Sequence, residues 1–157
     1  MPVQPLFDIS AIDKTQVRSS AEEVGRINPQ CGHMRHLDHI IWASDDLCDV
    51  LGVKHVRHDE FWVPGHIPGR PLLPGVLMIE AAAQVSSWLQ RSKYENLGFL
   101  GFTRCDETSF RGQVVPGDTL YLLAHELTSS RKRFVCLAQG IVDGRIVFES
   151  KITGMTF

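Results

Sequence analysis

Two side chains that could exchange protons flank a proline- and glycine-rich turn in GHIPGRPLLPGVLMIEAAAQ, residues 65–84. His66 lies between Gly65 and Pro68, which restrict the backbone, and a histidine held in a stiff loop suits a general base. Glu80 lies within an apolar run that predicts a helix. Burial would disfavour the charged carboxylate and raise its pKa, which suits a general acid.

Gly75 adds a third chemical group. It stands where the predicted helix begins, and the first N–H groups of a helix have no intrahelical acceptor and lie at the positive end of the helix dipole. A carbonyl oxygen that gains negative charge would be stabilised there. A base, an acid and such a donor are the set needed to remove a proton next to a carbonyl and expel a hydroxyl from the next carbon.

Each of these residues also has a purely structural interpretation. His66 could pack at a turn, Gly75 could permit close packing, and Glu80 could face a subunit boundary or pair with a buried arginine. The loop and the helix could also hold His66 and Glu80 too far apart within one chain. A dimer that shares the pair between its subunits would remove that difficulty.

The elements around these residues predict an α+β domain. The run from Val76 to Leu89, opened by Pro74 as a favoured first helical residue, is too long for one strand. Its apolar residues do not fall on one stripe, so we expect a buried, central helix. Strand patterns flank it, and we expect those after the helix to form an antiparallel meander in a sheet that curls around the helix. These strands are HIIWAS and CDVLGVKHV before it and LGFLGFTRCDETSF, TLYLLAHELTSS, RFVCLAQGIV and RIVFESKITGMTF after it.

The N-terminal part differs from the rest. Residues 1–30 are polar and mixed, and we expect a peripheral extension in which SSAEEVGRI forms a short helix capped by serine. Residues 31–157 form the single predicted domain.

Composition limits the possible functions. The chain of 157 residues is 43% hydrophobic and 22% charged, as in globular proteins. A net charge of -2 disfavours nucleic-acid binding, for which a basic surface is expected. We expect no membrane contact and a cytoplasmic location, since the sequence shows neither a basic leader nor a membrane-spanning run. Four cysteines without a C-x-x-C pair predict reduced thiols: Cys31, Cys48, Cys105 and Cys136.

The segment from Gly65 to Gln84 closely resembles the signature of the FabZ-type 3-hydroxyacyl-acyl-carrier-protein dehydratases, which have the hotdog fold. The resemblance continues in KHVRHDEFWVPGH, FRGQVVPGDTLYLLAHEL and GIVDGRIVFES, and covers roughly residues 35–157. It implies that His66 takes the C2 proton of a 3-hydroxyacyl thioester and that Glu80 of the partner subunit protonates the departing C3 hydroxyl.

The same resemblance assigns the neighbouring residues. The Gly75 N–H would polarise the thioester carbonyl, with Val76 beside it in the substrate-binding group, and Gln84 would help to hold the acid. No metal and no redox cofactor is implied. The FabA branch carries an aspartate at the position of Glu80, so the glutamate favours simple dehydration without isomerisation. Arg70 stands where the family usually has a second histidine, and beside the site it could lower the pKa of Glu80.

The resemblance also predicts partners. The substrate would be a thioester of acyl carrier protein or coenzyme A. The protein would be a homodimer with shared active sites. Whether three such dimers assemble into a hexamer stays open. Acyl carrier protein is acidic, so the basic residues of SSRKR, or Arg111, could form part of its docking patch, although SSRKR is also typical of a solvated hairpin turn. These residues are Arg111, Arg131, Lys132 and Arg133.

Two other functions remain compatible with the sequence. A hotdog thioesterase would use the carboxylate to direct water at the thioester carbonyl, and a catalytically silent hotdog module would bind acyl thioesters or stabilise a partner. In CGHMRHLDH, residues 31–39, several side chains of metal-ligand type lie close together. Their spacing matches no compact zinc motif, so we expect an exposed segment that leads into the first strand.

Overall fold

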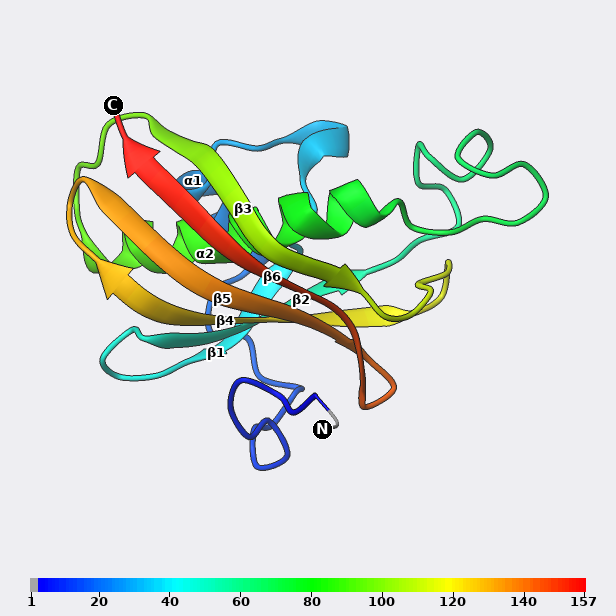
Figure 1. Ribbon diagram of the computed structural model, residues 1–157, viewed down its shortest axis with the longest axis horizontal. Coiled ribbons are helices and arrows are strands. Elements are labelled where there is room, and N and C mark those ends of the chain that lie inside the picture. The colour runs from blue at the N-terminus through cyan, green and yellow to red at the C-terminus, as the bar shows by residue number, and fades with distance from the viewer. Residues whose placement is uncertain (1–2) are drawn as a thin grey trace.

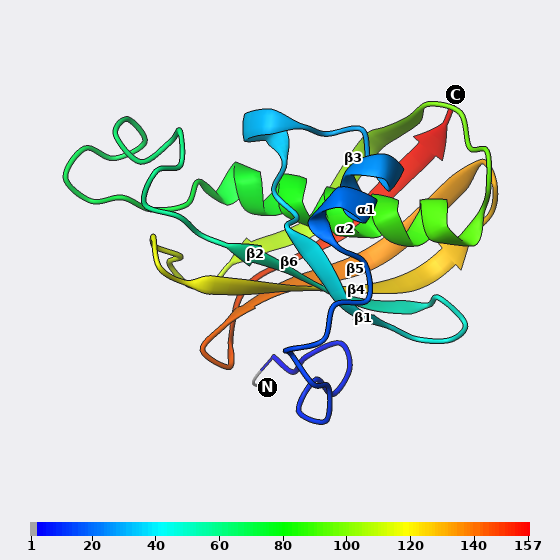
Figure 2. The ribbon, with the colours of Figure 1, turned by 180° about the vertical axis from the view of Figure 1, so that it is seen from behind.

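The computed structural model describes residues 3–157, in which a long helix crosses one face of a six-stranded antiparallel sheet (Figure 1, Figure 2). The long helix is α2 (Gly75–Lys93), and α1 (Ala21–Ile27) and the 3-10 turn η1 (Gly32–Met34) precede the sheet. The strands are β1 (His39–Ala43), β2 (Asp49–His55), β3 (Leu100–Phe110), β4 (Thr119–Ser129), β5 (Arg133–Val142) and β6 (Arg145–Thr156). The predicted α+β class and the central helix are confirmed.

The strand order corrects one part of the prediction. The order across the sheet is β1-β2-β4-β5-β6-β3, so β4, β5 and β6 form a meander, but β3 pairs with β6 and not with β4. Short turns join β4 to β5 and β5 to β6, whereas residues 111–118 separate β3 from β4. Such a connection is longer than a hairpin loop and lets the chain cross the sheet. The two edges of the sheet are therefore β1 and β3.

Helix α2 is held by its apolar contacts with the sheet. It begins at Gly75 with Pro74 as its N-cap residue, one position later than predicted. Met78, Val85 and Leu89 are at most 3% exposed, and each fully buried side chain of this size contributes roughly 1.5–3 kcal/mol. These contacts fix the position of every residue that α2 carries.

The N-terminal segment covers the opposite face of the sheet (Figure 1). The carboxamide of Gln139 on β5 anchors this segment, since it accepts from the Leu6 N–H at 2.9 Å and donates to the Gln4 carbonyl at 3.1 Å. The predicted short helix is confirmed as α1, which Ser20 caps together with Glu23. Apolar side chains of the segment pack on a buried cluster of the sheet; they are Leu6, Phe7, Ile9 and Ile12.

The segment that leads into β1 was expected to be exposed, and this is wrong for its second half. His36 and Leu37 are 0% exposed because this part of the chain runs between α2 and the loop that follows β2. Neither ring nitrogen of His36 has a hydrogen-bond partner within residues 3–157. Burial, reinforced by the charge of Lys54, lowers the pKa of His36 to about 4. The ring is therefore neutral near pH 7.

Acid destabilises the protein through His36. Its pKa rises from about 4 in the folded chain to an unfolded value of 6.5, so the unfolded state binds the proton first as the pH falls. Above pH 6.5 the ring is neutral in both states and its titration does not change stability; stability is lost as the pH falls from 6.5 to 4, by about 2 kcal/mol at pH 5. Urea denaturation at pH 8 and pH 5 should show that His36→Leu removes this loss. The exposed His33→Leu is the matched control, and an unchanged pH dependence in His36→Leu would contradict the assignment.

Candidate active site

The loop that carries His66 projects beyond the N-terminal end of α2 (Figure 1, Figure 2). Its base is fixed by a buried ion pair in which Lys54 Nζ lies 2.9 Å from Glu60 Oε1, and by the buried ring of Trp62. The Trp62 carbonyl accepts from the N–H groups of Gly65 and His66 at 3.2 and 2.9 Å. The loop is thus exposed at its tip but anchored at its base.

One hydrogen bond sets the proton position on the His66 ring. Nδ1 lies 2.8 Å from the Leu72 carbonyl oxygen. A carbonyl only accepts, so Nδ1 carries the hydrogen and, in the neutral ring, Nε2 presents its lone pair. The side chain is exposed, so this lone pair is available as a base.

Glu80 is half-buried on α2, and a buried amide fixes its orientation. Gln84, one turn further along, is 1% exposed and donates from Nε2 to Glu80 Oε1 at 2.8 Å. The same nitrogen donates to the Met34 carbonyl at 2.6 Å, and Gln84 Oε1 accepts from the His36 N–H at 2.8 Å. The segment before β1 therefore holds Gln84, and Gln84 holds Glu80.

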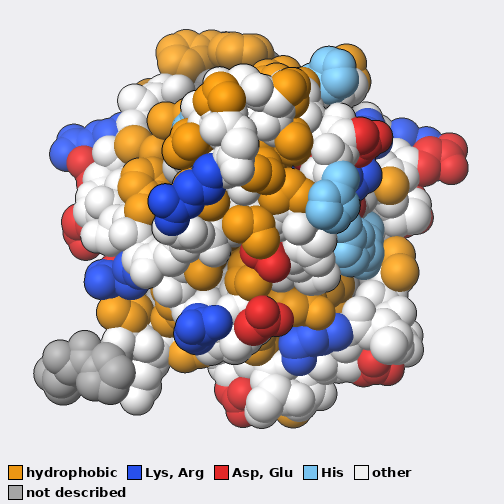
Figure 3. Space-filling view, turned by 90° about the vertical axis from the view of Figure 1, so that its right-hand side faces the viewer, with side chains coloured by type: hydrophobic (Ala, Val, Ile, Leu, Met, Phe, Trp, Pro, Cys, Tyr) orange, Lys and Arg blue, Asp and Glu red, His pale blue; other side chains and the backbone are white. Residues whose placement is uncertain are grey.

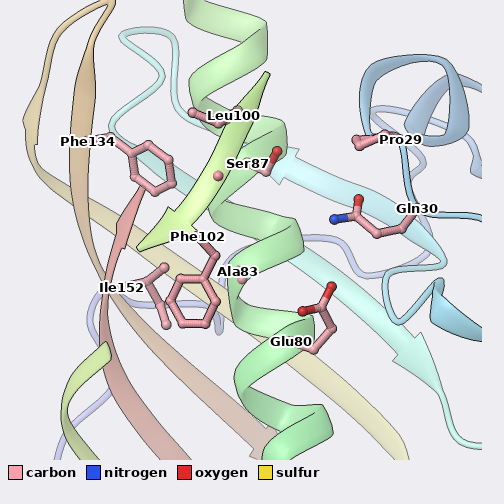
Figure 4. A pocket seen from close by; sticks show the side chains of 10 residues that line it. Pro29, Gln30, Glu80, Ala83, Ser87, Leu100, Phe102, Phe134 and Ile152 are labelled. Atoms are coloured by element: carbon pink, nitrogen blue, oxygen red, sulfur yellow. The ribbon is translucent and has the colours of Figure 1, made fainter. Parts of the chain in front are cut away.

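Glu80 opens into a small pocket between α2, β3 and the segment before η1 (Figure 4). Its volume of about 50 Å³ is far below the 300–1,000 Å³ of a typical ligand site. None of its lining residues comes from the His66 loop, so one chain does not bring His66 and Glu80 together in this pocket. Besides Glu80, the lining residues are Pro29, Gln30, Ala83, Ser87, Leu100, Gly101, Phe102, Phe134 and Ile152.

Gly75 is the first residue of α2, and its structural interpretation is confirmed. A Cβ atom there would lie 2.8 Å from Cε1 of Phe110, so the glycine lets the aromatic ring of β3 pack on the start of the helix. As a first-turn residue, Gly75 also has an N–H group without an intrahelical acceptor. Val76 follows with 68% of its side chain exposed. The roles of both residues toward a substrate stay predictions.

The basic residues predicted for carrier docking lie in two places. Arg111 follows β3, near the start of α2, and forms an ion pair with Glu149. Arg131, Lys132 and Arg133 lie at the β4–β5 hairpin, which is at the opposite end of the sheet from the His66 loop (Figure 1). The four residues therefore do not form one continuous patch.

Arg70 is exposed in the same loop as His66, where its backbone N–H donates to the Ile67 carbonyl at 2.9 Å. Within residues 3–157 it forms no ion pair with Glu80, so it does not neutralise that carboxylate in one chain. In the same range, no three His, Cys, Asp or Glu side chains converge on a possible metal position. No helix in that range has the length and apolar character to cross a membrane. The prediction of free thiols is confirmed for all four cysteines.

Sequence reasoning missed two residues at this site. Asn28 is 3% exposed and donates from Nδ2 to the backbone carbonyl of Gln84 at 2.8 Å. Gln30 lines the pocket beside Glu80. Both lie far from α2 in the sequence, and only two polar side chains flanking Pro29 could have drawn attention to them.

Comparisons with known proteins show first the fold and then the family. One chain of the dehydratase heterocomplex ApeI:P of Xenorhabdus doucetiae matches with a TM-score of 0.71 at 19% identity, over 85% of this chain and 90% of that chain. The predicted hotdog fold is thereby confirmed. A sequence profile of the FabA-like domain matches residues 28–151.

Proteins similar in sequence identify the branch of this family. The FabZ 3-hydroxyacyl-acyl-carrier-protein dehydratase of Streptococcus equi subsp. zooepidemicus is 38% identical over 118 residues, which cover 74% of this chain and 83% of that protein. The corresponding protein of Streptococcus mutans is 36% identical over the same length and the same shares of both chains. The chain belongs to the FabA-like family, in the branch of the FabZ-type dehydratases.

The close contact at Gly75 predicts a stability effect. Gly75→Ala should lower the free energy of unfolding by about 0.5–1.5 kcal/mol, because the added methyl group pushes the half-exposed ring of Phe110 away from its preferred rotamer. Gly65→Ala is the matched control, since a Cβ atom there meets nothing within 4 Å. Urea denaturation of both variants measures the difference, and equal stabilities would show that Phe110 moves aside at no cost.

Proposed function

We propose that the protein dehydrates 3-hydroxyacyl thioesters to trans-2-enoyl thioesters in fatty-acid biosynthesis. Its relatives are named as 3-hydroxyacyl-acyl-carrier-protein dehydratases, which supports this proposal. The proposal rests on two side chains that the chain holds in fixed orientations. His66 has Nδ1 occupied by a carbonyl and Nε2 free, and Glu80 is held by the buried amide of Gln84. The first group can take a proton and the second can give one.

The reaction follows from these two roles. His66 Nε2 removes the proton from C2, the electron pair of that C–H bond forms the C2–C3 double bond, and the C3–O bond breaks. The leaving oxygen keeps the electron pair of that bond and takes the proton of Glu80, so water departs. The Gly75 N–H, at the positive end of α2, stabilises the charge that develops on the thioester oxygen, with Val76 beside it. No metal or redox cofactor takes part in these steps.

The proposal includes a homodimer in which His66 of one subunit meets Glu80 of the other. The separation of the two residues within one chain and the small volume of the pocket support it. The edge strand β3 supports the dimer as well. Its unpaired backbone groups and the exposed side chains of Phe102 and Phe110 are features that a second subunit would bury. Hydrophobic side chains also gather on the end of the molecule at which the loop projects (Figure 3). A trimer of such dimers, a hexamer, is compatible with this arrangement.

The substrate carrier in this proposal is acyl carrier protein or coenzyme A. Arg111 directly follows Phe110, whose ring lies against Gly75 at the start of α2, whereas Arg131, Lys132 and Arg133 would contact an acidic carrier only at a second position. We place the protein in the cytoplasm, where the free thiols of its cysteines would persist.

Loss of the acid should abolish the reaction. With a but-2-enoyl thioester as substrate, hydration should proceed in wild type and fall by at least about 100-fold in Glu80→Gln, because the group that gives a proton in dehydration is the base that takes the proton of water in hydration. The fall of the conjugated ultraviolet absorbance measures the rate, and Glu95→Gln, an exposed position after α2, is the matched control.

The other functions give different outcomes in the same assay. Release of free thiol, detected with Ellman's reagent, would indicate a thioesterase, because dehydration and hydration leave the thioester intact. Tight binding of the thioester without turnover, unchanged in Glu80→Gln, would indicate a silent binding module. Either result would contradict the dehydratase.

The edge strand provides a test of the dimer. Cys105 lies in the exposed middle of β3, and a lysine on an edge strand opposes pairing with another chain. Cys105→Lys should sediment as a folded monomer without hydratase activity. Asp45→Lys, in the turn that joins β1 to β2 at the opposite edge, should remain dimeric and active. A monomeric wild type, or a dimeric and active Cys105→Lys, would contradict the proposed interface.

A further inference from the structure

The pocket beside Glu80 contains a second polar group that the proposed reaction does not yet use. Gln30 lines this pocket from the segment before η1, and Figure 4 shows its carboxamide and the Glu80 carboxylate extending into the space between that segment and α2. Within residues 3–157, the carboxamide oxygen of Gln30 is buried and accepts no hydrogen bond. A buried polar atom without a partner costs stability, so its retention calls for an explanation.

The position of Gln30 is fixed by its neighbours in the chain. Asn28, two residues before it, is buried and donates to the backbone of α2 at Gln84 with a distance of 2.8 Å. Met34, four residues after it, accepts from the side chain of the same Gln84 at 2.6 Å. Gln30 lies between these two attachments, so the residue that orients Glu80 also sets the position of Gln30.

The volume of the pocket limits what can bind between the side chains of Gln30 and Glu80. A water molecule needs at least about 10–15 Å³ of such space, so a volume of about 50 Å³ accommodates a hydroxyl group and the carbon that bears it. The carboxamide of Gln30 has both donors and an acceptor, and a half-turn about its last bond puts the amino group where the unpartnered oxygen lies. The buried acceptor without a partner is then replaced by a donor for an oxygen in the pocket. The carboxamide can therefore bind an oxygen that Glu80 also reaches.

We infer that Gln30 binds the oxygen atom exchanged at C3, and that its N–H group stabilises the negative charge on this oxygen as the C3–O bond breaks. This inference rests on the proposed dehydratase function. Glu80 supplies the proton and the Gln30 amide supplies a neutral hydrogen bond to the same oxygen, which then departs as water. In the hydration direction, the two groups hold the attacking water in the same position.

The variant Gln30→Met tests this role, because methionine has a similar length and volume and cannot form the hydrogen bond. The kcat and kcat/KM for hydration of a but-2-enoyl thioester should fall together by roughly 10–100-fold, as expected for a bond made only in the transition state. The melting temperature should not fall, because the substitution removes a buried atom without a partner. Gln16→Met, at an exposed position in the N-terminal segment, is the matched control and should behave as wild type.

A second substrate distinguishes this role from a structural one. Elimination from a 3-chlorobutyryl thioester removes the same C2 proton and releases chloride, which needs neither a proton nor a strong hydrogen bond. Gln30→Met should therefore eliminate chloride within about threefold of the wild-type rate. Equal loss with both substrates would mean that Gln30 only supports the structure, and no loss with either would mean that it does not touch the reacting oxygen. A wild type without hydratase activity would instead refute the proposed function itself.

Discussion

The buried carboxamide of Gln84 is the interaction on which the arrangement of the site depends. Its two ends bind the Glu80 carboxylate, the Met34 carbonyl and the His36 N–H, and it is 1% exposed. Removing this amide would leave buried backbone groups without partners, at a cost of about 1–3 kcal/mol for each. One side chain therefore links the orientation of the Glu80 carboxylate to the folding of the segment that precedes β1. The burial of His36 follows from the same link.

The second constraint is that Glu80 and His66, the proposed acid and base, lie in different parts of one chain. Glu80 faces the edge strand β3, whereas His66 lies on a loop that extends past the start of α2 and is anchored by the buried pair Lys54 and Glu60. The Glu80 carboxylate is held by one hydrogen bond, and the His66 ring has a fixed tautomer. The two groups could act on one substrate only if it lay between them. The unpaired edge of β3 and the exposed apolar side chains near it are the features of the chain through which a second copy would close this distance.

Much of this arrangement could be predicted from the sequence because the signals are local. The apolar run after Pro74 predicted α2, the alternating segments predicted the strands, and the spacing of His66, Gly75 and Glu80 together with the family resemblance indicated the chemistry. The pairing of β3 with β6 could not be predicted in this way, since it depends on a connection that crosses the sheet. Gln30 and Asn28 were missed because they meet α2 only after folding, and no pattern within their own segment marks them as neighbours of Glu80.

In the proposed dimer, each active site combines His66 of one subunit with Glu80 of the other. The most direct test is to refold the inactive variants His66→Ala and Glu80→Gln together in equal amounts, with a different affinity tag on each to show that subunits have mixed. Half of the dimers are then mixed and each holds one intact site, so hydratase activity should return to about one quarter of the wild-type value. Mixed dimers without any recovered activity would contradict the shared site.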